Sequence, residues 1–394
     1  MNKSFLILAL VLLGFPTLKA QVEYSPVTTS TPFLMIVPDS RGGAMGDIGV
    51  ATSPDANSIF YNPAKLAFAS HQFNVGINYV PWLRNITNDV FVSNLMFTSR
   101  LDERSAWGVN LKYFSYGKID TNNGEFDPSG DLISTGIEKP YEMAISGAYA
   151  LKLSENFSMG VGMRYIHSDI AIRVDDSPIK KVNTVSVDVS GYFQSDEKNF
   201  GEFNGRYRGG FNISNIGPKV SLYDGGEDSF IPTNLRLGGG FDFILDDMNT
   251  ITANVEFNKL LVPTPPIRDR KDLDGDGDRD EILEGKDDNV GFISGMFQSF
   301  GDAPGGFSEE LKEFTWAVGT EYMYDHTLAI RAGYFNEHDL KGARKYFTLG
   351  AGFKFKNSTI DFSYLINSSA INNPLDNTLR FSLSLDFGDI YEDF

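Results

Sequence analysis

The fold of this chain is decided by a stretch near its end that reads Leu379-Arg380-Phe381-Ser382-Leu383-Ser384-Leu385-Asp386-Phe387. Apolar and polar residues alternate through the whole stretch. Successive side chains of a β-strand point to opposite faces, so this alternation predicts a strand with one apolar face and one polar face. Such a strand suits a wall that has lipid on one side and a polar lumen on the other.

The same alternation recurs along the chain from residue 71 onward. One segment, 88–99, alternates poorly, because Val92 and Met96 compete with Leu95 for the apolar face. The pattern predicts fourteen strands, an even number, as bacterial single-chain barrels have. They are expected at about 71–81, 88–99, 106–114, 140–153, 157–170, 183–194, 203–213, 234–245, 250–258, 313–324, 327–335, 346–356, 358–366 and 378–387.

The connections between these segments alternate between short and long, as a barrel with short inner turns and long outer loops requires. Short turns are expected at 153–156, 246–249, 324–326 and 356–358, and long stretches at 115–139, 171–182, 214–233, 259–312, 336–345 and 367–377. A soluble β-sandwich would also alternate, but the strand number and the loop lengths favour the barrel. The sequence therefore predicts an all-β transmembrane protein, a 14-stranded antiparallel outer-membrane β-barrel over 71–394. Both termini should be periplasmic, with the longest extracellular loop at about 259–312.

The beginning of the chain predicts a cleaved signal peptide over residues 1–20. Lys3 supplies a positive charge, 5–15 is an apolar run, and Ala20 is a small residue at the expected cleavage site. The apolar run is too short to cross a bilayer as a helix.

The amino-acid composition argues against several kinds of chemistry and partner. The chain contains no cysteine, which excludes a disulfide framework, thiolate chemistry and lipid attachment to a cysteine. Its formal net charge of −18 at pH 7 argues against nucleic acid as a partner.

Residues 21–70 do not alternate, so they are not expected in the barrel wall. A fourteen-stranded lumen is too wide for the wall's own side chains to close. The segment 21–70 is therefore predicted to be an N-terminal plug (hatch) inside the barrel. The dipeptide Asn62-Pro63 indicates a turn or the start of a helix within it.

This segment also carries a resemblance to a known family. Its Met-Gly-x-x-Gly-Val-Ala run, followed by Asn-Pro-Ala, resembles the N-terminal hatch of the FadL-like outer-membrane barrel superfamily. More narrowly, the chain is similar to the PorV (LptO) family over the whole of its mature length. The residues that carry the plug motif are Arg41, Met45, Gly46, Asp55, Asn57, Asn62, Pro63 and Ala64.

The resemblance implies a role in the type IX secretion system of Bacteroidota. A PorV protein docks beside a large translocon barrel (SprA or Sov) and accepts cargo through the cargo's conserved C-terminal domain. It then carries the cargo to a surface attachment complex, where the sortase PorU removes that domain and joins the cargo to lipopolysaccharide in the outer membrane. The alternative is a FadL-like transporter of hydrophobic compounds. A surface adhesin or an enzyme is a third class.

One motif in the long stretch 259–312 suggests a metal ion. An aspartate stands at every second position of this motif, and two of the positions between them are glycines. The carboxylates offer hard oxygen ligands that suit Ca²⁺. Position twelve of an EF-hand would be Leu283 rather than glutamate, so an isolated calcium loop is the better hypothesis. The competing interpretation is a solvated acidic loop. Calcium is the one cofactor that the sequence suggests. The residues are Asp272, Asp274, Asp276, Asp278 and Asp280.

The sequence does not favour an enzyme. It contains four histidines and no Gly-x-Ser-x-Gly motif. His167 and Ser168 are neighbours on a predicted strand, so their side chains should point to opposite faces rather than toward one another. We therefore expect no catalytic site.

Overall fold

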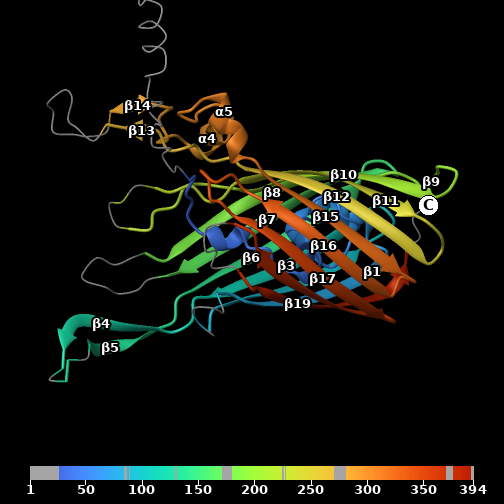
Figure 1. Cartoon of the computed structure of the whole chain (residues 1–394), viewed down its shortest axis with the longest axis horizontal. Coiled ribbons are helices and arrows are strands. Elements are labelled where there is room, and N and C mark those ends of the chain that lie inside the picture. Colours follow the sequence, from blue (N-terminus) through green and yellow to red (C-terminus); the bar gives the residue numbers. More distant parts are fainter. Residues whose placement is uncertain are drawn as a thin grey trace, which may run out of the picture.

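The computed structural model describes residues 26–391, apart from 84–86, 88, 128, 131, 171–179, 224–225, 227, 270–280 and 370–375. Fourteen antiparallel strands form a closed barrel, because β1 pairs with β19 as well as with β2 (Figure 1). The strands of the wall are β1 (His71–Pro81), β2 (Phe91–Arg100), β3 (Ser105–Ser115), β6 (Tyr141–Lys152), β7 (Phe157–Asp169), β8 (Val182–Gln194), β10 (Asn204–Ile216), β11 (Asn234–Ile244), β12 (Asn249–Leu260), β15 (Thr315–Tyr324), β16 (Leu328–Asn336), β17 (Lys345–Phe355), β18 (Ser358–Asn367) and β19 (Leu379–Ile390).

The predicted strands are confirmed, with boundaries that differ by no more than three residues. The largest differences lie at the start of β2 and at the ends of β10 and β19. Leu383 and Phe381 of β19 are exposed on the outer wall, whereas Arg380 and Ser382 are buried toward the lumen. The two faces of this strand therefore have the polarity that the alternation predicts.

Strand β2 departs from the alternation because it carries apolar residues on both faces. Leu95 lies on the outer wall, while Val92 and Met96 are buried inside the barrel. Val92 packs in a cluster with Phe33, and Met96 packs in another with Ile59. The inner apolar residues thus meet the N-terminal part of the chain rather than water.

The connections also alternate in length. Turns such as 153–156 and 356–357 lie at one end of the barrel, hereafter the short-turn end. The opposite, long-loop end carries two structured loops that the sequence did not predict in detail (Figure 1). The first holds the hairpin of β4 (Ile119–Phe126) and β5 (Leu132–Glu138).

The second structured loop connects β12 to β15. It holds β13 (Ile267–Arg268), β14 (Ile282–Glu284), α4 (Phe292–Gln298), α5 (Phe307–Glu310) and η3 (Leu311–Glu313). We call residues 281–314 the cap. A short strand at the other end of the molecule, β9 (Lys198–Asn199), pairs antiparallel with the start of β10.

Most of the described N-terminal residues, 26–70, lie within the barrel, where Figure 1 shows them in blue. The first of them lie at the long-loop end, where the Ser30 N–H donates to the Phe230 carbonyl oxygen in the loop between β10 and β11 at 2.8 Å. They form η1 (Pro32–Met35), α2 (Ser40–Ala44), α3 (Ser58–Tyr61) and η2 (Pro63–Phe68). This placement is the one expected of a plug, although the expected boundary at residue 21 lies outside the described residues. Each helix of the described chain is too short or too polar to cross a membrane.

A charge on the outer wall should destabilise the barrel. Ile145 lies near the middle of β6 and is exposed on the outer face. We expect Ile145→Arg to lower the free energy of unfolding in lipid bilayers by roughly 2–4 kcal/mol, because arginine is costly near the bilayer midplane. Urea titration of the reconstituted protein measures this. Ile145→Leu is the control, and equal stability of the two variants would contradict a lipid-facing position.

Candidate functional site

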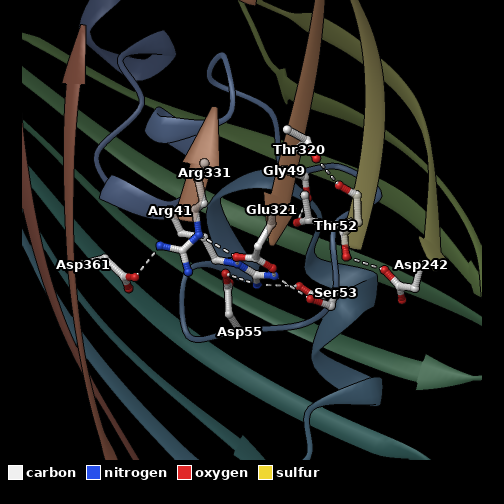
Figure 2. A network of polar contacts seen from close by, with 12 residues as sticks. Arg41, Gly49, Thr52, Ser53, Asp55, Asp242, Thr320, Glu321, Arg331 and Asp361 are labelled. Carbon is white, nitrogen blue, oxygen red and sulfur yellow. Dashed lines mark hydrogen bonds and ion pairs between the residues drawn. The ribbon is translucent and has the colours of Figure 1, made fainter. Parts of the chain in front are cut away.

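Buried ion pairs join the N-terminal segment to the barrel wall (Figure 2). Arg41 of α2 donates from Nε and Nη2 to the Glu321 carboxylate on β15, at 3.1 and 2.9 Å. Its Nη1 donates to Asp55 Oδ2 at 2.9 Å. On the other side of Glu321, Arg331 donates from Nε at 2.5 Å and reaches Asp361 through Nη1, also at 2.5 Å. Two arginines therefore share one carboxylate inside the barrel.

The local fold of the segment positions Arg41. Asp39 caps the N-terminus of α2, because its Oδ2 accepts a hydrogen bond from the Gly42 N–H at 2.8 Å. The Tyr61 hydroxyl donates to the other oxygen of Asp39 at 2.6 Å and so ties α2 to α3. The start of this short helix is thereby fixed beside β18 and β19, where the Ser40 N–H donates to Ser382 Oγ at 2.8 Å. From there the Arg41 side chain reaches β15.

The Met45-Gly46 pair fits tightly against the wall. Gly46 has φ +81°, and a Cβ at this position would lie 2.9 Å from the Tyr334 carbonyl oxygen. Its N–H donates to Thr348 Oγ1 at 2.9 Å. Met45 is buried in a cluster with Phe335. A side chain at residue 46 would thus be both strained and obstructed.

The Asn62-Pro63-Ala64 run joins the segment to the opposite wall. Asn62 caps η2 by accepting from the Ala64 N–H at 3.0 Å, and Pro63 occupies the first turn, where a missing N–H costs nothing. The Asn62 amide donates to the carbonyl oxygens of Val50 and Gly191, at 2.9 and 3.0 Å.

The eight residues of the plug motif therefore lie together in the described N-terminal segment. Asn57, another residue of this motif, accepts a hydrogen bond from Asn78 of β1 at 2.8 Å. Sequence reasoning missed their wall partners, among them Glu321. The sequence does show a charged residue on the polar face of a predicted strand, but it does not show which plug residue that charge contacts.

Two further carboxylates complete the attachment. Glu256 of β12 accepts from the N–H groups of Gly49 and Val50, at 2.8 and 2.9 Å, and pairs with Arg236 at 3.1 Å. Asp47 pairs with Arg380 of β19 at 2.6 Å. The segment is thus bound by polar groups from β1, β8, β12, β15, β17 and β19. These contacts come from many sides of the wall, which indicates a fixed occupant of the lumen.

A cavity of about 210 Å³ remains between the segment and the wall, on the side of the short-turn end. Charged groups from both surround it: Arg41, Asp55, Arg331, Lys354, Asp361 and Asp386. Pockets for apolar molecules are lined mainly by hydrophobic side chains. The polar lining of this cavity does not suit a hydrophobic compound.

The cap is attached to the barrel rim by buried lysines. Lys259, at the end of β12, contacts Glu310 at 3.1 Å and Glu313 at 2.5 Å. Lys341, in the loop between β16 and β17, contacts Glu309 at 2.5 Å and Glu313 at 3.0 Å. Since Glu313 meets both lysines, the two loops are joined into one unit.

Asp302 lies within the same cluster and is buried. Its Oδ2 accepts from the Thr264 N–H at 3.2 Å, while its Oδ1 has no hydrogen-bond partner. Burial, together with the nearby charge of Glu310, raises the pKa of Asp302 to about 6.

The predicted calcium ligands Asp272, Asp274, Asp276, Asp278 and Asp280 lie outside the described residues. The calcium loop therefore stays a prediction. Within the described part of the chain, no group of three or more histidine, aspartate or glutamate side chains is arranged to hold a metal ion.

His167 and Ser168 point to different faces of β7, as predicted. The His167 ring lies near Tyr141 and Asn183, whereas Ser168 is buried toward the lumen. This arrangement does not bring the pair together as a nucleophile and its base.

Comparison with known protein families identifies the relatives of this chain. The family model described as "Type IX secretion system protein PorV" matches residues 19–267. The chain belongs to the PorV family. Membership of this family makes it an outer-membrane component of the type IX secretion system. No curated protein matches it.

Solved structures similar to this PorV-family chain are outer-membrane barrels. A mutant of the TodX monoaromatic hydrocarbon channel aligns with TM-score 0.51 and 11% identity, covering 89% of this chain and 99% of that one. The toluene transporter TbuX of Ralstonia pickettii aligns with TM-score 0.47 and 12% identity, over 90% and 100%. A FadL homologue of Pseudomonas aeruginosa aligns with TM-score 0.43 and 11% identity, over 92% and 100%. The TodX mutant shows that the fold is shared, and at this identity it shows the fold alone.

Removing Glu321 should destabilise this PorV-family barrel. Glu321→Ala would leave Arg41 and Arg331 buried side by side without the carboxylate between them. We expect the free energy of unfolding to fall by about 3–5 kcal/mol, the cost of an uncompensated buried charge. Urea titration measures the loss. Glu284→Ala, which removes an exposed carboxylate of the cap, should change stability by less than about 0.5 kcal/mol. Equal effects would contradict the importance of the buried pairs.

The cap should become more stable as the pH falls from neutral toward 5. A carboxyl whose pKa is raised on folding binds its proton more tightly in the folded state, so stability decreases as pH rises between the unfolded value of 3.8 and about 6. Asp302→Asn should remove this dependence and slow proteolysis of the cap at pH 7.5. Limited proteolysis at pH 7.5 and 5.5 tests both. An Asp302→Asn cap that retains the wild-type pH response would contradict the assignment.

Proposed function

We propose that this chain is the shuttle of its secretion system. It accepts cargo that carries the conserved type IX C-terminal domain from a translocon barrel of the SprA or Sov type. It delivers that cargo to the attachment complex that contains the sortase PorU. The PorV family match supports a role in secretion. The filled lumen supports a shuttle as the form of that role.

The observation that carries the proposal is the bound N-terminal segment. Arg41, Asp47 and Asn62 are held by different parts of the wall, through buried groups. A folded cargo domain has no route through a lumen filled in this way. Binding at the loops, where the structured cap and the β4–β5 hairpin lie, needs no such route.

The same interior disfavours the alternative, a FadL-like transporter of hydrophobic compounds. An apolar cluster lies inside the barrel, but Phe33 and Leu34 of η1 are buried within it. Lys112 fixes η1 in place, because its Nζ donates to the carbonyl oxygens of Leu34 and Ile36, at 3.3 and 2.5 Å. A hydrophobic ligand would have to displace the protein's own side chains.

The orientation follows from this proposal. We place the short-turn end and the C-terminus in the periplasm, after removal of the signal peptide 1–20, and the long-loop end outside the cell. The expected periplasmic N-terminus does not fit this orientation, because Ser30 lies at the long-loop end, where its N–H donates to the Phe230 carbonyl oxygen at 2.8 Å. In this orientation the cap and the hairpin face the cargo, the attachment complex and lipopolysaccharide. Calcium bound at 272–280 would stiffen the loop that carries the cap.

A cross-link between the N-terminal segment and the wall tests the proposal. A Cβ added at Gly76 would lie 3.3 Å from the Ala56 Cβ, close to disulfide geometry, and its other near neighbour is the flexible side chain of Met96. The chain has no cysteine of its own. We expect the oxidised Ala56→Cys/Gly76→Cys variant to secrete cargo at the wild-type level and to co-purify with a translocon barrel and with cargo.

Each single-cysteine variant and the reduced double variant serve as controls. Secretion that stops on oxidation and returns on reduction would contradict a shuttle with a fixed lumen. Purification of the wild-type barrel with apolar small molecules, and without translocon or cargo, would favour the transporter.

A further inference from the structure

The first described residues of the chain form a strap at the long-loop end. We use this name for residues 26–31. Ser30 donates twice to the Phe230 carbonyl oxygen, from its N–H at 2.8 Å and from its Oγ at 3.0 Å. Directly after the strap, η1 is fixed in the lumen, because Lys112 donates to carbonyl oxygens at the end of this helix. The strap is thus tied to the loop between β10 and β11 and is continuous with the fixed η1.

Thr31, the last residue of the strap, is strained. Its φ is +50°, a left-handed conformation that a β-branched residue rarely adopts. Its hydroxyl is buried and has no hydrogen-bond partner within the described chain. A left-handed backbone and an unpaired buried hydroxyl both cost free energy, and such costs persist only where the surrounding contacts hold the residue in place. Thr31 is therefore the point at which the strap would separate from η1.

Phe230 joins the strap to the cap. Its carbonyl oxygen accepts the two hydrogen bonds from Ser30, while its ring packs against α4, where a Cβ at Gly295 would lie 2.8 Å away. Lys219 Nζ lies 4.8 Å from the centroid of the same ring and donates to Asn289 Oδ1 of the cap at 3.3 Å. One residue of the loop thus contacts both the strap and the cap.

Helix α4 fits closely at this contact. Ile293 and Phe297 are exposed to solvent on its other side. Gly295 is buried, and a Cβ there would also lie 3.0 Å from Pro263 Cδ. No side chain fits between α4 and the loop at this position. A movement of the cap relative to the loop therefore acts directly on Phe230.

We propose that the cap and the strap are coupled through Phe230, so that displacement of the cap releases the strap. The release ends at η1, because Lys112 holds that helix, and the rest of the plug keeps its place. This inference goes beyond the proposed shuttle function, since it holds for any partner that moves the cap. Coupling between two sites acts equally in both directions, so loosening the strap also loosens the cap.

A cysteine in place of Thr31 reports release of the strap. The chain has no other cysteine, and Thr31→Cys removes a hydroxyl that has no hydrogen-bond partner. In isolated outer membranes, the rate at which a water-soluble maleimide labels this cysteine measures how often the strap opens. Gly295→Leu in the full-length protein forces α4 away from Phe230. We expect it to raise the labelling rate about 5- to 30-fold, the factor that corresponds to the strain of one left-handed residue.

The matched control is Gly291→Leu, the same change one helical turn earlier. A Cβ at Gly291 meets open space, so the labelling rate should not change. Phe230→Ala tests the link from the other side, because it removes the ring and keeps the carbonyl oxygen. Alone it should raise the rate, since the cap no longer holds this residue. In the Phe230→Ala background, Gly295→Leu should change the rate by less than about twofold.

Three outcomes would contradict the coupling. Equal labelling rates in the Gly295→Leu and Gly291→Leu proteins would show that the strap does not respond to the cap. An unchanged rate in the Phe230→Ala protein, or a full effect of Gly295→Leu in its absence of a ring, would remove Phe230 as the link. Protease resistance of the barrel confirms that each variant folds. Cargo secretion is not the readout, so these outcomes are independent of the shuttle function.

Discussion

Backbone hydrogen bonding in lipid is the constraint on which the rest of this structure depends. Hydrocarbon offers no partner for an unpaired N–H or C=O group, so a sheet that spans the bilayer must close on itself. Here β19 pairs with β1 and completes the ring. Fourteen strands then enclose a lumen wider than inward side chains can fill. The N-terminal segment occupies that space and brings the charges that the inner wall requires, such as Arg41 opposite Glu321.

The wall could be predicted from sequence because lipid on one side and a polar interior on the other impose a period of two on every strand. The prediction was weakest at β2, where Val92 and Met96 meet apolar residues of the segment instead of water. The plug motif could be located but not explained, because its partners lie on distant strands. Glu321 is 280 residues from Arg41. The exposed faces of α4 and α5 were not predicted either, since the same spacing commonly marks a buried face.

The interior and the loops follow opposite rules. Inside the barrel, many polar groups are buried and paired, as Glu256 is with two backbone N–H groups and Arg236. At the long-loop end, Phe297 and Phe307 are apolar and face solvent. The family relationship assigns the chain to secretion, and this division of chemistry explains how a barrel of transporter-like fold suits that role. The groups that line its lumen are used in contacts within the chain. The apolar side chains that face solvent lie on the loops, outside the barrel.

The pairing of Arg380 with Asp47 has a consequence for biogenesis. Arg380 belongs to β19, the last strand made, whereas Asp47 belongs to a segment made before any strand of the wall. β19 also closes the ring against β1. An empty barrel that closed early would leave this arginine, Glu256 and Glu321 without their counterparts from the segment. Ring closure and filling of the lumen are therefore energetically coupled, and a hollow intermediate is unfavourable during assembly in the membrane.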